Sequence, residues 1–284
     1  MEHYFYYNMK DEKRKGSVNK MSDIKHTCIE NATRIVIKVG TSTLTHKTGM
    51  INIRKIEKLV KVISDIANSG KEIVLVSSGA VSAGFAKLGR DGRGSSLEEK
   101  QAAAAVGQCE LMNMYDRLFS EYGYTVAQIL ITKDVIDLPV RRENAENTFK
   151  TLIENRCIPI VNENDSVSFE GLKFGGNDTL SAYVALLTDA DLLINMSDID
   201  GLFDSDPRQN PNARLISSVT SISDDIRLAA GGAGERGTGG MLAKLEAAEL
   251  VGTKHIKMII LNGAKPEILY SVFEDKFLGT VFEL

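Results

Sequence analysis

The chain has 284 residues, of which 43% are hydrophobic and 25% are charged, and its formal net charge at pH 7 is -4. This is the composition of an ordinary globular protein, and the length predicts one large domain or two domains of medium size. The acidic balance argues against a dedicated nucleic-acid binder, while it leaves room for local basic sites that hold an anionic ligand. We therefore expect a small molecule as the partner and no nucleic acid.

The cysteines and histidines are scattered. Cys28, Cys109 and Cys157 form no CxxC pair, and the four histidines lie equally far apart in the sequence. This distribution argues against a disulfide framework and against a structural zinc site, and it fits a reducing cytoplasm. No apolar run approaches the length that spans a bilayer, so we expect a soluble, cytoplasmic protein.

Residues 1–30 mix aromatic, basic and acidic side chains. They lack the continuous apolar core of a secretory signal, and their acidic residues argue against a transit peptide. We expect a disordered N-terminal extension here, with Met9 and Met21 as alternative translation starts.

Residues 34–44, RIVIKVGTSTL, change abruptly from a β-branched run to a lysine, a glycine and small hydroxyl residues. The β-branched run predicts a buried strand, and Gly40 lets the backbone approach another group closely because it has no Cβ. Lys38 at the end of this strand has two interpretations. Either it extends into solvent, as an isolated lysine commonly does, or it faces a phosphoryl group in transfer.

Strands and helices then alternate along the first half of the chain. Apolar periodicity or alanine-rich composition predicts helices at residues 53–67, from about 80 to 88, at 97–119 and at 144–155. Buried-strand patterns occur at residues 73–76, 125–131 and 157–161, and residues 166–174 predict a hairpin or lid. Strand, helix and strand of these lengths form a βαβ unit.

The second half repeats the pattern. We predict helices at residues 177–187, 222–229, 241–251 and 266–273, and strands at 191–196, 255–261 and 279–282. The predicted fold class is α/β, a three-layer αβα sandwich with a mostly parallel central sheet. A shift in composition at about Gly175 predicts two lobes, at about residues 31–175 and 176–284.

The glycine-rich segment 231–240 contains Gly232-x-Gly234-x-x-Gly237, which formally matches the dinucleotide-binding fingerprint. The segment follows an apparent helix and not a first strand, and this position argues against a Rossmann-type NAD site. The chain contains no GxxxxGK[ST], HRD or DFG motif, which excludes P-loop and protein-kinase mechanisms. The helix that follows carries Lys244 near its start. Its free amides and this lysine form a candidate polyphosphate site, and the alternative is a flexible loop with a solvated lysine.

Polar clusters follow several predicted strands or begin helices: Ser77-Ser78-Gly79, residues 162–165, Asn177-Asp178 and Ser197-Asp198. Each cluster alone is more often capping or turn chemistry. Because the carboxyl ends of parallel strands share one edge of a sheet, where ligands bind, their joint occurrence with Lys38 predicts a functional site.

The segments KVGTSTL, VSSGAVSAG, VGQCELM, QILIT, VNENDSV, FGGNDTLSA, SDIDGLFDSDPR and GTGGMLAK occur in this order. From about residue 31 to the end, the chain resembles the glutamate 5-kinase family of the amino acid kinase superfamily. The resemblance implies ATP-dependent phosphorylation of the γ-carboxylate of L-glutamate, with Mg²⁺ bridging the nucleotide phosphates, as the first step of proline biosynthesis. Alternatives are a kinase for another small acid, such as carbamate or aspartate, and a non-catalytic amino-acid-binding sensor.

The resemblance also implies roles for individual residues. The catalytic set is Lys38, Asp178 and Lys244, and the glutamate-binding set is Ser78, Asp165 and Asn177. The ATP-binding set is Lys38, Ser197, Asp198, Thr238, Gly239, Gly240, Met241, Leu242, Ala243 and Lys244. No protein ligand to a metal is implied.

The chain departs from the family in three places. Leu242-Ala243 stands where many members have a hydroxyl residue before the lysine, and Ser197 replaces a threonine of many bacterial members. The C-terminal RNA-modification-type domain of many bacterial members does not follow residue 284. The resemblance further implies a homo-oligomer, feedback inhibition by proline, and glutamate-5-semialdehyde dehydrogenase as a functional partner.

Overall fold

The computed structural model describes residues 29, 31–92, 95–168, 174–231, 240–274 and 276–284. The expected disordered extension and most of the expected hairpin or lid lie outside these residues. Ile29 is an exception, because it is buried in the hydrophobic core although we placed it in the extension. The packed domain therefore begins slightly before residue 31.

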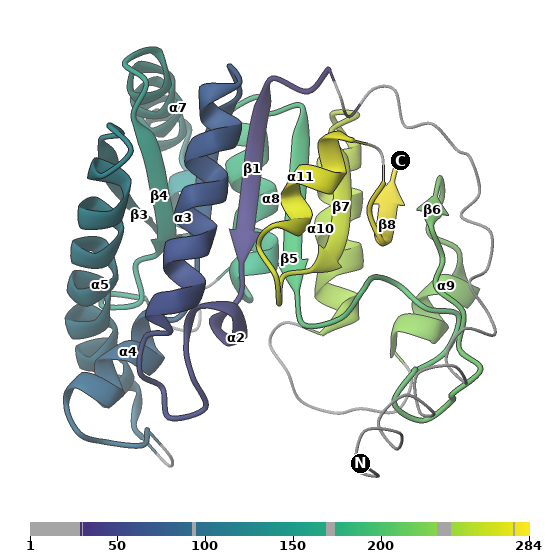
Figure 1. Cartoon of the computed structure of the whole chain (residues 1–284), viewed down its shortest axis with the longest axis horizontal. Coiled ribbons are helices and arrows are strands. Elements are labelled where there is room, and N and C mark those ends of the chain that lie inside the picture. The colour runs from purple at the N-terminus through teal and green to yellow at the C-terminus, as the bar shows by residue number, and fades with distance from the viewer. Residues whose placement is uncertain (1–28, 30, 93–94, 169–173, 232–239, 275) are drawn as a thin grey trace, which may run out of the picture.

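Eight strands form one sheet in the order β3-β4-β2-β1-β5-β7-β8-β6 (Figure 1). Their bounds are β1 Arg34–Val39, β2 Glu72–Ser77, β3 Val126–Ile131, β4 Ile158–Glu163, β5 Leu192–Ser197, β6 Ser218–Val219, β7 Lys257–Asn262 and β8 Gly279–Phe282. Among the described strands, neighbours are parallel except for β7 and β8. The mostly parallel sheet of the prediction is confirmed.

Helices cover both faces of the sheet (Figure 1). Their bounds are α2 Thr41–Leu44, α3 Ile53–Asn68, α4 Ala80–Lys87, α5 Leu97–Ser120, α6 Asp134–Asp137, α7 Pro139–Glu154, α8 Asn177–Leu187, α9 Asp224–Gly231, α10 Met241–Gly252 and α11 Ile268–Phe273. Within the described ranges, none of these helices is long and apolar enough to cross a membrane.

Two hydrophobic clusters, one on each face of the sheet, define the three layers. Ile35 and Ile37 of β1 pack with α3, α5 and α11 on one face, and Val36 packs with α7, α8 and α10 on the other. Successive side chains of a strand point to opposite faces, so Lys38 follows Val36 toward α8 and α10. The three-layer αβα sandwich of the prediction is therefore confirmed.

Strands that follow β1 in the sequence are added to the sheet on both sides of it. β1 pairs with β2 on one side and with β5 on the other, so the strand order reverses at β1. In open α/β sheets, ligands bind at the carboxyl ends of the strands where such a reversal occurs. This topology places the end of β1, with Lys38 and Gly40, at the expected ligand edge. The division into two lobes at about Gly175 stays a prediction.

Three short elements were not predicted, namely α2, α6 and β6. In addition, α7 begins at Pro139 and not at residue 144, as predicted. Proline suits the first turn of a helix, where its missing N–H has no intrahelical acceptor. The first two turns of α7 contain no buried residue, so they carry no apolar periodicity from which a helix could be predicted.

Candidate active site

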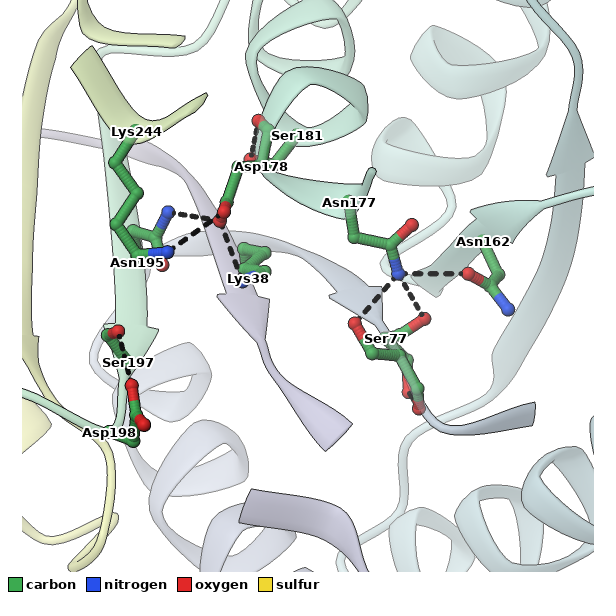
Figure 2. A network of polar contacts seen from close by, with 11 residues as sticks. Lys38, Ser77, Asn162, Asn177, Asp178, Ser181, Asn195, Ser197, Asp198 and Lys244 are labelled. Atoms are coloured by element: carbon green, nitrogen blue, oxygen red, sulfur yellow. Dashed lines mark hydrogen bonds and ion pairs between the residues drawn. The ribbon is translucent and has the colours of Figure 1, made fainter. Parts of the chain in front are cut away.

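Three charged side chains meet at the carboxyl end of β1 (Figure 2). The Nζ atom of Lys38 lies 2.7 Å from Oδ1 of Asp178, and the Nζ atom of Lys244 lies 2.9 Å from Oδ2 of the same carboxylate. The side chains of Lys38, Lys244 and Asp178 are 9%, 6% and 2% exposed. The interpretation of the two lysines as solvated side chains is therefore wrong, and the structure brings the predicted catalytic set together.

The local fold explains why Asp178 and Lys244 reach Lys38. Gly175 and Gly176 have φ angles of +84° and +131°, which side chains with a Cβ rarely adopt, and they turn the chain into α8. Asp178 then lies in the first turn of α8, where a negative charge interacts favourably with the helix dipole. Lys244 lies near the start of α10, which packs beside α8 on the same face of the sheet.

The three charges perturb one another. Burial acts to raise the pKa of the Asp178 carboxyl, but Lys38 and Lys244 outweigh burial, and the pKa lies below its ordinary value of 3.8. Burial lowers the pKa of Lys38 from its ordinary value of 10.5, and Asp178 offsets part of this effect. Two ammonium groups and one carboxylate together carry a net charge of +1. A positive charge held away from water favours the binding of an anion.

A fourth side chain, Asn195, completes this cluster and was missed from the sequence. Its Nδ2 atom donates a hydrogen bond of 2.7 Å to Oδ1 of Asp178, and its side chain is fully buried. In the parallel pair of β1 and β5, Asn195 lies directly beside Lys38. The available signal was a single amide among the apolar residues that make up the rest of β5 before Ser197.

A second polar cluster lies beside the first. Asn177 Nδ2 lies 2.8 Å from Ser78 Oγ, 3.0 Å from Asn162 Oδ1 and 3.1 Å from the Ser77 carbonyl oxygen (Figure 2). Asn162 in turn donates a hydrogen bond of 3.2 Å to Gln108 Oε1. The structure thus joins the predicted residues Ser78 and Asn177. Asn162 belongs to the polar cluster predicted at residues 162–165, whereas no role was predicted for Gln108.

These clusters face an open cleft with a volume of about 690 Å³. Its lining includes five predicted site residues: Lys38, Ser78, Asp165, Asn177 and Asp178. A polar cleft of this kind suits a small hydrophilic substrate better than a lipid or a large aromatic compound.

Apart from Lys38, the described members of the predicted ATP-binding set lie at or just after the end of β5 and at the start of α10. Ser197 is buried at the end of β5 and donates a hydrogen bond of 3.3 Å to Oδ1 of Asp198, whose carboxylate lies 3.6 Å from Arg208 at the surface. Gly240, Met241, Leu242 and Ala243 lead into Lys244 on α10. Leu242 is largely exposed. Thr238 and Gly239 lie outside the described residues.

The described carboxylates of this region do not form a metal cage. In the described ranges, no group of three or more His, Cys, Asp or Glu side chains is placed to hold a metal ion. Asp178 already accepts from two lysines and one amide. The donor set therefore fits a Mg²⁺ ion that is coordinated mainly by water and phosphate oxygens.

The fold and the lysine cluster define the class of protein. The profile of the amino acid kinase family matches residues 33–262. UMP kinase from Ureaplasma parvum superimposes with a TM-score of 0.63 at 18% identity, covering 89% of this chain and 99% of that one. Carbamate kinase from Giardia lamblia bound to AMP-PNP also gives a TM-score of 0.63 at 18% identity, covering 89% and 98%. At this identity the two structures show the shared fold alone.

Relatives with similar sequences identify the group within this family to which the chain belongs. Glutamate 5-kinase of Clostridium perfringens is 50% identical over 259 residues, which cover 89% of this chain and 96% of that protein. Glutamate 5-kinase of Listeria monocytogenes is also 50% identical over 259 residues, covering 89% and 94%. The chain belongs to the amino acid kinase family and, within it, to the glutamate 5-kinases.

Proposed function

We propose that this protein transfers the γ-phosphoryl group of ATP to the γ-carboxylate of L-glutamate, giving L-glutamyl 5-phosphate for proline biosynthesis. The supporting observation is the pair of buried lysines that share Asp178 at the edge of an open polar cleft. The 50% identity to enzymes named glutamate 5-kinase supports the choice of substrate.

The acceptor needs no general base. A γ-carboxylate is ionised at neutral pH and is already a nucleophile, so the protein has to position it and neutralise charge. We assign this positioning to Ser78, Asp165 and Asn177, which line the cleft. The hydrogen bond between Asn177 and Ser78 fixes part of the cleft before substrate arrives.

In the chemical step, a carboxylate oxygen of glutamate forms a bond to the γ-phosphorus of ATP. The bond from that phosphorus to the β,γ-bridging oxygen breaks, and its electron pair leaves on ADP. We assign Lys38 and Lys244 to the stabilisation of negative charge on the phosphoryl oxygens, and Asp178 to holding the two ammonium groups at the correct separation. Ser197, Asp198 and residues 238–244 are assigned to the nucleotide.

Mg²⁺, when bound, would neutralise charge on the phosphate oxygens of the nucleotide. The two alternative functions receive less support. A kinase for carbamate or aspartate would share the lysine cluster but not the 50% identity to glutamate 5-kinases. A sensor without catalysis has no need of two buried lysines on one carboxylate, an arrangement that requires desolvation of all three charges.

The remaining expectations belong to the same proposal. We expect a cytoplasmic homo-oligomer that L-proline inhibits in competition with glutamate. We also expect glutamate-5-semialdehyde dehydrogenase to consume the acyl phosphate.

The decisive experiment incubates the purified protein with ATP, Mg²⁺, hydroxylamine and a panel of amino acids. Hydroxylamine traps an acyl phosphate as a hydroxamate, which is measured by its colour with iron(III). We expect strong hydroxamate formation with L-glutamate alone. Equal or greater turnover of aspartate, or ATP consumption that depends on carbamate, would contradict the proposed substrate.

A further inference from the structure

Asn195 has two features that an ordinary core residue lacks. Its side chain is fully buried within β5, yet its carbonyl oxygen Oδ1 has no hydrogen-bond partner in the described part of the chain. A buried amide oxygen without a partner destabilises a fold, because it loses hydrogen bonds to water and gains none in return. The neighbouring strand residues Ile194 and Met196 are apolar, so the local sequence gives no packing reason for an amide here.

The other end of the same amide makes a directed contact. Asn195 Nδ2 lies 2.7 Å from Asp178 Oδ1, and the Lys38 ammonium lies 2.7 Å from that same oxygen (Figure 2). The orientation of the amide is unambiguous, since an ionised carboxylate accepts hydrogen bonds and donates none. The strand that carries Asn195 pairs directly with the strand that carries Lys38.

We propose that Asn195 is a positioning residue, which holds the Asp178 carboxylate in the orientation that spaces Lys38 and Lys244 for the phosphoryl group. The inference rests on the phosphotransfer proposed above.

The physical reason is the directionality of the amide. A carboxylate rotates readily about its terminal bond, and an ammonium group on a flexible stem does not fix that rotation. An amide on a central strand supplies a donor with a fixed direction. Because the amide is neutral, it leaves the net charge of +1 on the two lysines and the aspartate unchanged. A charged donor at this point would change that balance.

Two substitutions of Asn195 and one control test the inference. Asn195→Leu removes the donor and the unpartnered oxygen together. We expect kcat to fall by about tenfold or more, with the glutamate KM within about twofold of wild type and Tm no lower than wild type. Asn195→Asp keeps the size of the side chain but replaces the donor with a carboxylate that cancels the net positive charge. For this variant we expect a larger loss of kcat and a higher KM for ATP.

The matched control is Ser64→Ala. Ser64 lies on α3, which packs on the opposite face of the sheet, and its Oγ is the other buried side-chain atom found without a partner in the described chain. Removal of this hydroxyl should leave kcat unchanged and should not lower Tm. The control separates the general effect of deleting an unpartnered polar atom from a specific effect on catalysis.

A merely structural role for Asn195 predicts the opposite result for Asn195→Leu, namely a lower Tm with an unchanged kcat, and that result would overturn the inference. Should Asn195→Leu fail to fold, a wild-type kcat in Asn195→Asp would overturn it as well. A wild-type protein that forms no hydroxamate with glutamate refutes the proposed function instead, and the kcat comparison is then made with the acid that the panel identifies.

Discussion

Replacement of Lys244 by alanine is the most direct test of the proposed chemistry. Lys244 is buried and lies 2.9 Å from Asp178, so its removal deletes one of the two ammonium groups and leaves a neutral pair of Lys38 and Asp178. Loss of one preorganised group that stabilises transition-state charge lowers kcat by about 10² to 10³, which corresponds to roughly 3 to 4 kcal/mol. We expect a loss of this size in Lys244→Ala.

The loss should fall on kcat and not on the glutamate KM. The side chain of Lys244 does not line the cleft, and an interaction made mainly in the transition state does not appear in KM. Lys244→Arg should restore little activity, because a planar guanidinium does not reproduce the compact ammonium. The effect on stability should stay below the roughly 3 to 5 kcal/mol that follows when a buried charge loses its partner, since Asp178 keeps Lys38 and Asn195.

Steady-state kinetics by the hydroxamate assay, with circular dichroism to confirm folding, measures the predicted changes in kcat and KM. Lys254→Ala is the matched control, because Lys254 is exposed just beyond the end of α10 and should leave both kcat and KM unchanged. A folded Lys244→Ala enzyme with near wild-type kcat would refute the reasoning and leave Lys38 as the sole cationic group in the proposed mechanism.

Four further outcomes are expected. The double substitution of Lys38 and Lys244 by alanine leaves buried Asp178 without an ion pair. Urea unfolding should then show a loss of stability of about 3 to 5 kcal/mol, which exceeds the sum of the losses in the two single variants. Additive losses of stability would argue against a shared carboxylate. Folding lowers the pKa of Asp178 below 3.8, so the ionised carboxylate stabilises the fold at pH values above 3.8. This stabilisation is lost as the pH falls through the pKa that Asp178 has in the folded protein. Acid unfolding should therefore be less steep in Asp178→Asn than in wild type. L-proline should raise the apparent glutamate KM of wild type, and a folded Asp165→Ala variant that proline still inhibits equally would remove Asp165 from the inhibitor site. A Cβ on Gly107 of α5 would lie 1.8 Å from a backbone oxygen of α4. Gly107→Ala should therefore lower the stability by about 1 to 3 kcal/mol and raise the glutamate KM. An unchanged Tm would contradict the close packing of α4 and α5.

The fold was largely predictable because its signals are local. An apolar run such as Ile73–Val76 indicates a buried strand by itself, and the periodicity of α3 indicates an amphipathic helix by itself. β6 has only two residues, Ser218 and Val219, and exists because it pairs with β8 more than 60 residues later in the chain. No local pattern specifies such a strand.

The same distinction separates the site residues that were predicted from Asn195, which was missed. Lys38, Asn177 and Asp178 stand at element ends, where the sequence changes from apolar to polar, so their common edge follows from the order of the elements. Asn195 stands inside a strand, where a polar residue indicates neither a partner nor a face.

Its role depends on the register between two strands that lie far apart in the sequence. The observed register pairs Asn195 with Lys38 and places both on the face covered by α8 and α10. Side chains alternate along a strand, so a shift of β5 by one residue relative to β1 would exchange the faces and turn Ile194 toward Asp178. The carboxylate would then lose its amide donor while the sequence of β5 stayed the same. The positions of the charged residues can thus be predicted from the sequence, whereas the contacts between their side chains depend on the register of the strands in the assembled sheet.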